Sequence, residues 1–262
     1  MNNGEKSRAD LRDIKSRVIE YAALSEAKPE KSARVNQDSH LEYQKGDLFA
    51  AVVADGIGGA PGGEIASQLM IAASKEVADR EAEAETQPKK SLPKILDEMT
   101  ETGDTDIRDV WNRDPQYSGM GTTFAGLIIR GNEFACANVG DTRIYRKRGS
   151  IWGQLSEDHT KEAELLKKGV SPEEAMKESH IITHEIGYGP DRIKPCHHQL
   201  PIKSGEIFLL TSDGIHTRLT DQELFDLINE QDSAETIAQK IMAATKIKGL
   251  YDDATVVVVK VK

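Results

Sequence analysis

The sequence predicts an α+β fold in which two packed antiparallel β-sheets carry helices on their outer faces. Two observations predict this arrangement. The middle of the chain is a run of short apolar segments joined by the two-residue turns Gly131-Asn132 and Gly149-Ser150, which are typical of β-hairpins. Segments with helical periodicity precede, interrupt and follow these strands, so we expect the helices on the outside of the sheets.

The first half of the chain predicts one buried strand followed by two helical segments. Residues 48–54 (LFAAVVA) form an unbroken apolar run of strand length, which ends at Asp55-Gly56. A helix is expected over 62–85, and a second helical stretch begins at Ser91 and runs with breaks toward Trp111. The apolar residues that share one face of the first helix are Ile65, Leu69, Ala72, Ala73 and Val77.

The middle of the chain predicts four consecutive strands, at 122–130, 133–139, 143–148 and 151–155. Because their connections are too short for crossover helices, these strands form an antiparallel meander and not a βαβ series.

The last hundred residues predict a polar segment and then a mixture of helices and strands. Ser171-Pro172 with Glu174 is typical of a helix start within the polar stretch 160–195. A strand over 206–211 is followed by a capping box formed by Thr220 and Glu223. The remaining elements are an amphipathic helix over 234–246 and a buried strand over 254–260 (ATVVVVK).

Composition excludes several classes of protein. The formal net charge is −10 and the pI is near 5.3, which argues against nucleic-acid or anionic-membrane partners. The polar N-terminus is not a secretory signal, and no apolar run approaches the roughly 20 residues that a membrane-spanning helix needs. We therefore expect a cytoplasmic protein, with residues 1–262 forming a single domain after a lead-in at 1–15.

Acidic residues stand at the ends of several predicted strands. One Asp-Gly pair at a strand end is usually a turn. When several strand ends converge on one rim, however, their carboxylates repel each other unless a cation neutralises them, and oxygen ligands of this kind suit Mg²⁺ or Mn²⁺. The sequence therefore predicts a metal site. The carboxylates concerned are Asp38, Asp55, Asp141, Asp213, Asp252 and Asp253.

The glycines after Asp55 allow a backbone to approach an ion or a ligand closely. The segment DGIGGAPGGE lacks the Gly-Lys-[Ser/Thr] ending of a nucleotide-binding P-loop and does not match the spacing of a dinucleotide-binding turn.

An ordered set of short motifs resembles the metal-dependent protein phosphatases, the PPM or type 2C family, in bacterial-type form. Each motif is weakly diagnostic alone, but together they cover the chain from about residue 18 to 262 in the family's order. The motifs are Arg34-Val-Asn36-Gln37-Asp38, Asp55-Gly56-Ile57-Gly58-Gly59, Gly121-Thr122-Thr123, Asn138-Val-Gly140-Asp141-Thr142-Arg143, Asp158-His159, Ser212-Asp213-Gly214 and Asp252-Asp253-Ala-Thr255.

The resemblance implies a central antiparallel β-sandwich with helices on both sides, an αββα four-layer fold, and two or three Mn²⁺ or Mg²⁺ ions at one edge. Asp55 would bridge two ions, the Gly56 carbonyl would bind one, and Asp213 and Asp252 the other. Asp141 with Asp213 would hold a third ion. Asp38 would hold metal-bound water without binding an ion itself, and Arg34 would bind the substrate phosphate through its planar guanidinium.

Three positions depart from the family pattern. Ile57 stands where many eukaryotic members have a His proposed as general acid, so water or another group must protonate the leaving alkoxide; His40 has no assigned place. Gln37 replaces a common Glu. Asp253 replaces the usual Asn, which leaves open whether Asp252 or Asp253 is the ligand.

The implied activity is hydrolysis of phosphoserine and phosphothreonine in proteins by a water that bridges the two ions, with no covalent intermediate. The segment 160–195 matches the family's flap, which borders the substrate groove. The partners would be phosphoproteins made by a serine/threonine kinase, and we expect a monomer.

Two rival functions are a pseudophosphatase that only binds partners and a phosphoesterase acting on nucleotides or small phosphates. A soft-metal site at Pro195-Cys196-His197-His198 is a weaker reading, because no second cluster accompanies it.

Overall fold

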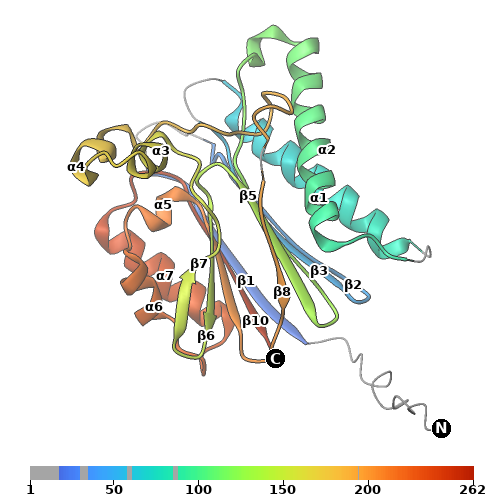
Figure 1. Ribbon diagram of the computed structural model, residues 1–262, viewed down its shortest axis with the longest axis vertical. Coiled ribbons are helices and arrows are strands. Elements are labelled where there is room, and N and C mark those ends of the chain that lie inside the picture. Colours follow the sequence, from blue (N-terminus) through green and yellow to red (C-terminus); the bar gives the residue numbers. More distant parts are fainter. Residues whose placement is uncertain (1–17, 30–34, 58–60, 85–87, 194) are drawn as a thin grey trace, which may run out of the picture.

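The computed structural model describes residues 18–29, 35–57, 61–84, 88–193 and 195–262. Two five-stranded antiparallel sheets stack face to face in the middle of the molecule (Figure 1). The first sheet has the strand order β1 (Ile19–Glu26), β10 (Ala254–Val261), β9 (Ile207–Thr211), β6 (Arg143–Arg148) and β7 (Ile151–Gln154). The second has the order β2 (Asp38–Lys45), β3 (Leu48–Asp55), β4 (Phe124–Arg130), β5 (Glu133–Val139) and β8 (Cys196–Pro201).

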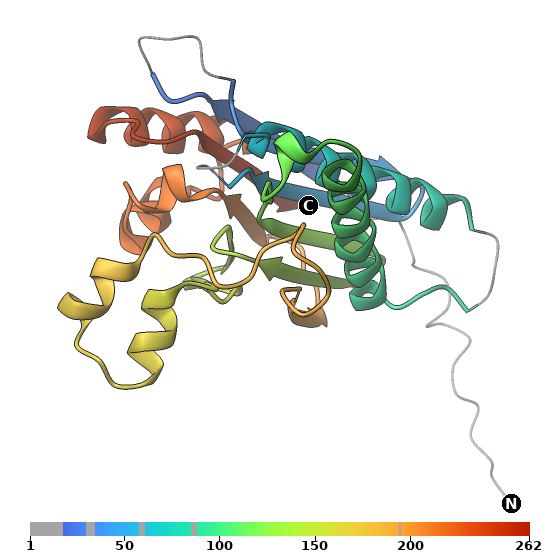
Figure 2. The same ribbon diagram turned by 90° about the horizontal axis from the view of Figure 1, so that it is seen from above.

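Helices cover the outer face of each sheet, which makes four layers (Figures 1 and 2). Helices α1 (Gly63–Glu83) and α2 (Leu92–Arg113) pack on each other over the second sheet. On the first sheet lie α5 (Asp213–His216), α6 (Asp221–Leu227) and α7 (Ala234–Lys248). The short helices α3 (Lys161–Lys167) and α4 (Pro172–Ala175) project beside one end of the sandwich. The expected α+β, αββα fold is confirmed.

Three apolar layers hold this stack together. The central strands β3, β4, β9 and β10 are buried on both faces, because each sheet has the other sheet on one side and helices on the other. Between the sheets, the Phe134 and Phe208 rings meet edge to face with centroids 4.8 Å apart, and Phe49 lies in the same layer. The burial of large aromatic and branched side chains here fixes the distance between the sheets, and with it the spacing of the strand ends.

The predicted meander is divided between the two sheets. The hairpins β4–β5 and β6–β7 form as expected, but β6 pairs with β9 and not with β5. At Gly140, with φ of +92°, the chain leaves one sheet and enters the other. Only glycine adopts this conformation without strain, so the crossing falls directly before Asp141.

The structure changes four further details of the expected elements. Strands β1 and β8 were not predicted, and α2 is continuous where breaks were expected. Gly103 in α2 lies against Met70 of α1, where a Cβ atom would meet the methionine sulfur at 2.6 Å, so this glycine serves helix contact and not a break. Ala72 is exposed, because the buried face of α1 is centred on Ala66, Met70, Ala73 and Val77.

Candidate metal centre

Carboxylates from both sheets face one cavity at the end of the sandwich. The cavity has a volume of about 1110 Å³. Asp55 reaches it from the end of β3 and Asp141 from the crossing between the sheets, while Asp213 opens α5 after β9 and Asp252 precedes β10. The convergence predicted from strand ends therefore occurs.

Asp38 lies directly across from Asp55 in the register of β2 and β3. Asp38 is only 7% exposed. One of its carboxylate oxygens accepts the Ser212 hydroxyl at 2.6 Å, and the other, Oδ1, is buried with no hydrogen-bond partner in the described part of the chain. A buried carboxylate oxygen without a donor is costly, so it marks a place for a water or cation that the protein atoms do not supply.

The backbone of Asp55 is fixed by the threonine pair that follows Gly121. The Asp55 N–H donates to the Thr123 hydroxyl at 2.9 Å, and the Asp55 carbonyl accepts from the Thr122 hydroxyl and the Thr123 N–H, both at 2.9 Å. These bonds use the backbone groups of Asp55 and leave its carboxylate free to face the cavity.

Two glycines that follow the predicted ligands are required by close backbone packing. A Cβ atom on Gly56 would lie 2.2 Å from the Gly63 carbonyl oxygen, and one on Gly214 would lie 2.1 Å from the Asp253 carbonyl oxygen. Both Asp-Gly pairs were open to a turn reading. The structure instead places the glycines where only a residue without a side chain fits, which brings the strand ends together.

Asp141 is held at the crossing by the side chain of Asn138. The Asn138 side-chain amide nitrogen donates to the Gly140 carbonyl at 3.2 Å and to the Glu157 carbonyl at 2.7 Å. The Gly140 N–H in turn donates to His159 Nδ1 at 3.1 Å. The motif residues Asn138, Gly140 and His159 thus stabilise the turn that presents Asp141.

Asp252 and Asp253 both line the cavity, but they differ in burial and in hydrogen-bond partners. Asp253 is buried, and its two oxygens accept the backbone N–H groups of Lys28 at 2.8 Å and Gln37 at 2.7 Å. Asp252 is exposed at the cavity, and its Oδ1 accepts only the Asp253 N–H. Asp252 therefore has lone pairs available for a cation, whereas both carboxylate oxygens of Asp253 are already used.

Burial and mutual repulsion raise the pKa values of these carboxyl groups. Burial, with repulsion from Asp38 and the other carboxylates, raises the pKa of Asp55 well above its usual value. Burial raises the pKa of Asp38 and of Asp141 to about 7, and burial with repulsion from Asp252 raises that of Asp213 to about 6. Within the described ranges, no three His, Cys, Asp or Glu side chains already close into a ligand cluster. Facing carboxylates with raised pKa values and the unpartnered Asp38 oxygen fit a cation that would neutralise them.

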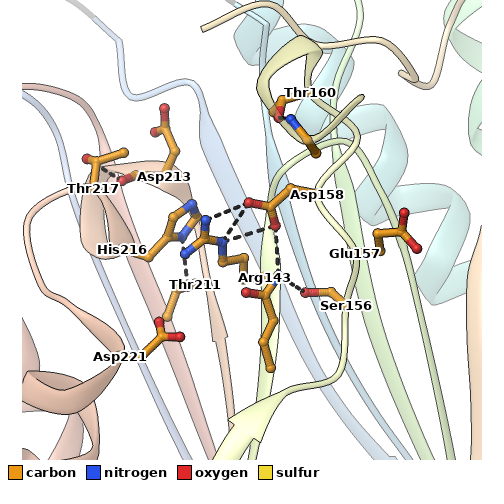
Figure 3. A network of polar contacts seen from close by, with 12 residues as sticks. Arg143, Ser156, Glu157, Asp158, Thr160, Thr211, Asp213, His216, Thr217 and Asp221 are labelled. Atoms are coloured by element: carbon orange, nitrogen blue, oxygen red, sulfur yellow. Dashed lines mark hydrogen bonds and ion pairs between the residues drawn. The ribbon is translucent and has the colours of Figure 1, made fainter. Parts of the chain in front are cut away.

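A half-buried ion pair beside the acidic rim was not predicted as such, although Arg143 and Asp158 both lie in the motifs. The Arg143 guanidinium donates to both oxygens of Asp158, at 2.5–3.0 Å (Figure 3). It also donates to the Tyr145 hydroxyl at 3.2 Å. His216 lies in the same network and contacts the Thr211 hydroxyl at 3.1 Å through Nδ1. Burial, with the nearby Arg143 charge, lowers the pKa of His216 well below its usual value, so this ring is neutral.

The other predicted residues have mixed outcomes. Arg34, with Gly58 and Gly59, lies outside the described residues. Ile57 and Gln37 line the cavity. His40 does not line it and contacts Glu42 at 3.0 Å.

The soft-metal reading of residues 195–198 finds no support in the described side chains. His197 and His198 are consecutive in β8, so they point to opposite faces of the sheet. His197 lies 2.8 Å from Asp97 of α2.

The segment 160–195 borders the cavity with Thr160, Glu162, Met176, Ser179, His180 and Ile182. Its far end is anchored by Asp104 of α2, whose carboxylate accepts the Gly187 and Gly189 N–H groups at 2.8 and 3.0 Å.

None of the helices in the described part of the chain is both long and apolar enough to cross a bilayer.

Comparison with known proteins identifies the family of this chain. Residues 27–248 match the family described as protein phosphatase 2C. The serine/threonine protein phosphatase PstP of Mycobacterium tuberculosis is 31% identical over 248 residues, which cover 93% of this chain but 45% of PstP, so the chain spans less than half of that relative. Protein phosphatase PhpP of Streptococcus pneumoniae is 31% identical over 228 residues, covering 86% of this chain and 91% of PhpP.

Two solved structures share the fold. The catalytic domain of PstP in complex with two manganese ions has a TM-score of 0.78 at 29% identity, covering 93% of this chain and 98% of that one. The serine/threonine phosphatase of S. agalactiae has a TM-score of 0.80 at 26% identity, covering 94% and 100%. The chain therefore belongs to the protein phosphatase 2C family.

Proposed function

We propose that this protein is a metal-dependent phosphatase that removes phosphate from serine and threonine side chains of other proteins. The observation that carries this proposal is the set of carboxylates from both sheets that face one cavity in a chain of the protein phosphatase 2C family. Relatives that are named serine/threonine protein phosphatases support the same activity.

The residues that would hold two ions are Asp55, the Gly56 carbonyl, Asp213 and Asp252, with Asp141 and Asp213 available for a third. Mn²⁺ or Mg²⁺ is the expected metal, and the two manganese ions of the PstP catalytic domain support it. Bound there, the ions would activate water for in-line attack on phosphorus and neutralise charge on the phosphoryl oxygens.

The chain's own residues would position the reactants. The unpartnered oxygen of Asp38 would accept a hydrogen bond from water at the rim and so orient it. Arg34 would bind the substrate phosphate, although its position lies outside the described residues. Ile57 lines the cavity and cannot transfer a proton, so protonation of the leaving alkoxide falls to water or to another group.

The remaining parts of the proposal concern the setting of the enzyme. Residues 1–262 would act as one domain, with the flap-like segment 160–195 bordering the substrate. The substrates would be phosphoproteins made by a serine/threonine kinase, met by a monomeric enzyme in the cytoplasm as part of signalling. The net charge of −10 disfavours nucleic-acid and membrane partners.

The test is hydrolysis of a phosphothreonine peptide by metal-stripped protein, with and without Mn²⁺. We expect turnover only with Mn²⁺, and loss of about a hundredfold or more in Asp55→Asn, because that change removes a charge from the predicted bridging ligand. Asp109→Asn on α2 is the matched control, since Asp109 is half-exposed and does not line the cavity.

Two other outcomes would replace the proposal. A folded protein that binds Mn²⁺ but turns over no phosphorylated compound would be a pseudophosphatase. Faster turnover of a nucleotide panel than of a phosphopeptide panel would indicate a small-molecule phosphoesterase.

A further inference from the structure

The arginine side chains that line the cavity differ in how many hydrogen-bond partners they have. Among the cavity residues that the structure describes, the arginines are Arg143 and Arg218. The Arg143 guanidinium donates hydrogen bonds to Asp158 (Figure 3) and to the Tyr145 hydroxyl. Arg143 is therefore a structural cation of this site, and Arg218 has to be considered separately.

Arg218 has guanidinium donors to spare. Its backbone N–H donates to the Ile215 carbonyl at 3.0 Å, which fixes its Cα just after α5. Its Nε makes one long hydrogen bond to the Thr217 hydroxyl at 3.4 Å, and no acceptor within the described ranges binds its two terminal nitrogens. Four N–H groups of a half-buried cation thus remain for a ligand.

An aromatic ring holds the Arg218 guanidinium at the edge of the cavity. The guanidinium carbon lies 4.7 Å from the centroid of the Tyr251 ring. Gly249 has φ of +96°, and a Cβ atom there would meet the Tyr251 ring at 2.8 Å, so this glycine lets the ring pack closely on the chain. A guanidinium stacked on a ring keeps its donor edge open, which is the arrangement that binds a carboxylate or phosphate side-on.

The position of Arg218 is beside the predicted metal ligands and not among them. Tyr251 directly precedes Asp252, and Arg218 lies near enough to Asp213 to stabilise its carboxylate. The cavity of about 1110 Å³ is far larger than a phosphoryl group, so residues that flank the phosphorylated side chain fit within it.

We propose that Arg218, stacked on Tyr251, binds an anionic group of the substrate that flanks the phosphoserine or phosphothreonine. The enzyme would then prefer phosphosites with a neighbouring acidic side chain or a second phosphate. This inference rests on the proposed function, since it names the substrate class of the same site.

The experiment compares kcat/KM for phosphothreonine peptides of one length. One peptide has neutral residues on both sides of the phosphothreonine. A second set carries a single Asp, placed in turn at each position from three residues before to three residues after the phosphothreonine. A third set carries phosphoserine in place of that Asp at the same positions. The readout is the ratio of kcat/KM for the best anionic peptide to that for the neutral peptide, taken within each variant, so that a general loss of activity cancels.

For the wild type we expect a ratio of about 5 to 20, carried by KM, as for a charge-assisted pair in a partly exposed site. In Arg218→Gln the ratio should fall to about 1, and Arg218→Lys should restore part of it because Lys keeps the charge but not the planar fork. Tyr251→Leu should give an intermediate ratio. Arg113→Gln is the control, because Arg113 lies on α2 with its side chain 78% exposed and should keep the wild-type ratio.

The outcomes separate the two proposals. Turnover of the neutral peptide with a wild-type ratio of 1 would overturn the role of Arg218 and leave the phosphatase function intact. An unchanged ratio in Arg218→Gln would also overturn the role of Arg218. If that variant lost kcat/KM equally on every peptide, Arg218 would instead bind the phosphate that is removed. Turnover of no peptide at all would overturn both. A higher ratio for Asp than for phosphoserine peptides would identify a carboxylate as the preferred group, and the reverse a second phosphate.

Discussion

The Asp253 carboxylate accepts the backbone N–H of Gln37 at 2.7 Å, across 216 residues of sequence. Its other oxygen accepts the N–H of Lys28 at 2.8 Å. Lys28 and Gln37 flank the segment that contains Arg34. The buried Asp253 side chain therefore ties both of these flanking residues to the chain next to Asp252. This arrangement gives a physical reason for the acidic residue at 253, because a carboxylate can accept two backbone donors through two oxygens whereas an Asn has one acceptor oxygen.

Asp253→Asn should therefore lower the free energy of unfolding by about 1–3 kcal/mol, since one buried N–H would face the amide group of Asn. Urea unfolding of the Mn²⁺-free protein measures this change. We also expect a higher KM for phosphopeptides, because the ends of the Arg34 segment would be held by one bond fewer. An unaltered unfolding free energy would show that the two hydrogen bonds do not stabilise the fold.

The neighbouring substitution Asp252→Asn should have the opposite profile. Asp252 is exposed and its carboxylate accepts only the Asp253 N–H, so the unfolding free energy should change by less than about 0.5 kcal/mol. Affinity for Mn²⁺, measured by titration calorimetry, should fall about tenfold or more, because the proposed ligand loses its charge. Weaker Mn²⁺ binding in Asp253→Asn than in Asp252→Asn would reverse the assignment of the ligand.

Gly214→Ala should disrupt the proposed metal site by displacing α5. The added methyl group would lie 2.1 Å from the Asp253 carbonyl oxygen, so α5 or the start of β10 has to move. We expect a loss of about 2 kcal/mol or more in unfolding free energy, together with weaker Mn²⁺ binding. Gly153→Ala is the matched control, because nothing lies within 4 Å of a Cβ atom there. Equal stability of the two variants would contradict the close packing at Gly214.

The carboxyl pKa values predict how stability depends on pH. Burial raises the pKa of Asp38 and Asp141 from 3.8 to about 7, and that of Asp213 to about 6. The folded state therefore binds more protons than the unfolded state between about pH 4 and pH 7, so the metal-free protein should lose stability as pH rises through this range.

The melting temperature of the metal-free protein should thus be lower at pH 8 than at pH 5. Saturating Mn²⁺ should remove most of this difference, because the cations neutralise the carboxylates and bind best when these are deprotonated. Thermal melts at both pH values, with and without Mn²⁺, measure the effect. A metal-free protein that becomes more stable toward pH 8 would mean that the carboxylates are not closely opposed in the fold.

Much of the secondary structure follows from local sequence. The run LFAAVVA became β3 and the Gly131-Asn132 turn formed the β4–β5 hairpin, because strand length and turn chemistry are decided by neighbouring residues. The capping box of Thr220 and Glu223 is present with both of its hydrogen bonds for the same reason.

Elements whose stability comes from distant partners were missed. Strand β1 carries a mixture of polar and apolar residues and pairs with β10 at the other end of the chain. Strand β8 contains consecutive histidines and is held at the edge of the second sheet by β5. Neither has a strong local signal, because the pairing itself supplies the backbone hydrogen bonds that make these residues strands.

The sequence by itself determined the fold class, the family resemblance and the acidic positions, since motif order, apolar runs and turn residues are properties of neighbouring residues. Only the tertiary structure decided that the two middle hairpins lie in different sheets. It also decided that the Asp253 carboxylate accepts the N–H groups of Lys28 and Gln37 while that of Asp252 stays available at the cavity. The same is true of the arginines, since the Arg143 guanidinium is bound to Asp158 whereas the terminal nitrogens of Arg218 have no acceptor in the described part of the chain. Each of these depends on which side chain is buried against which distant backbone, and that is fixed when the two sheets pack.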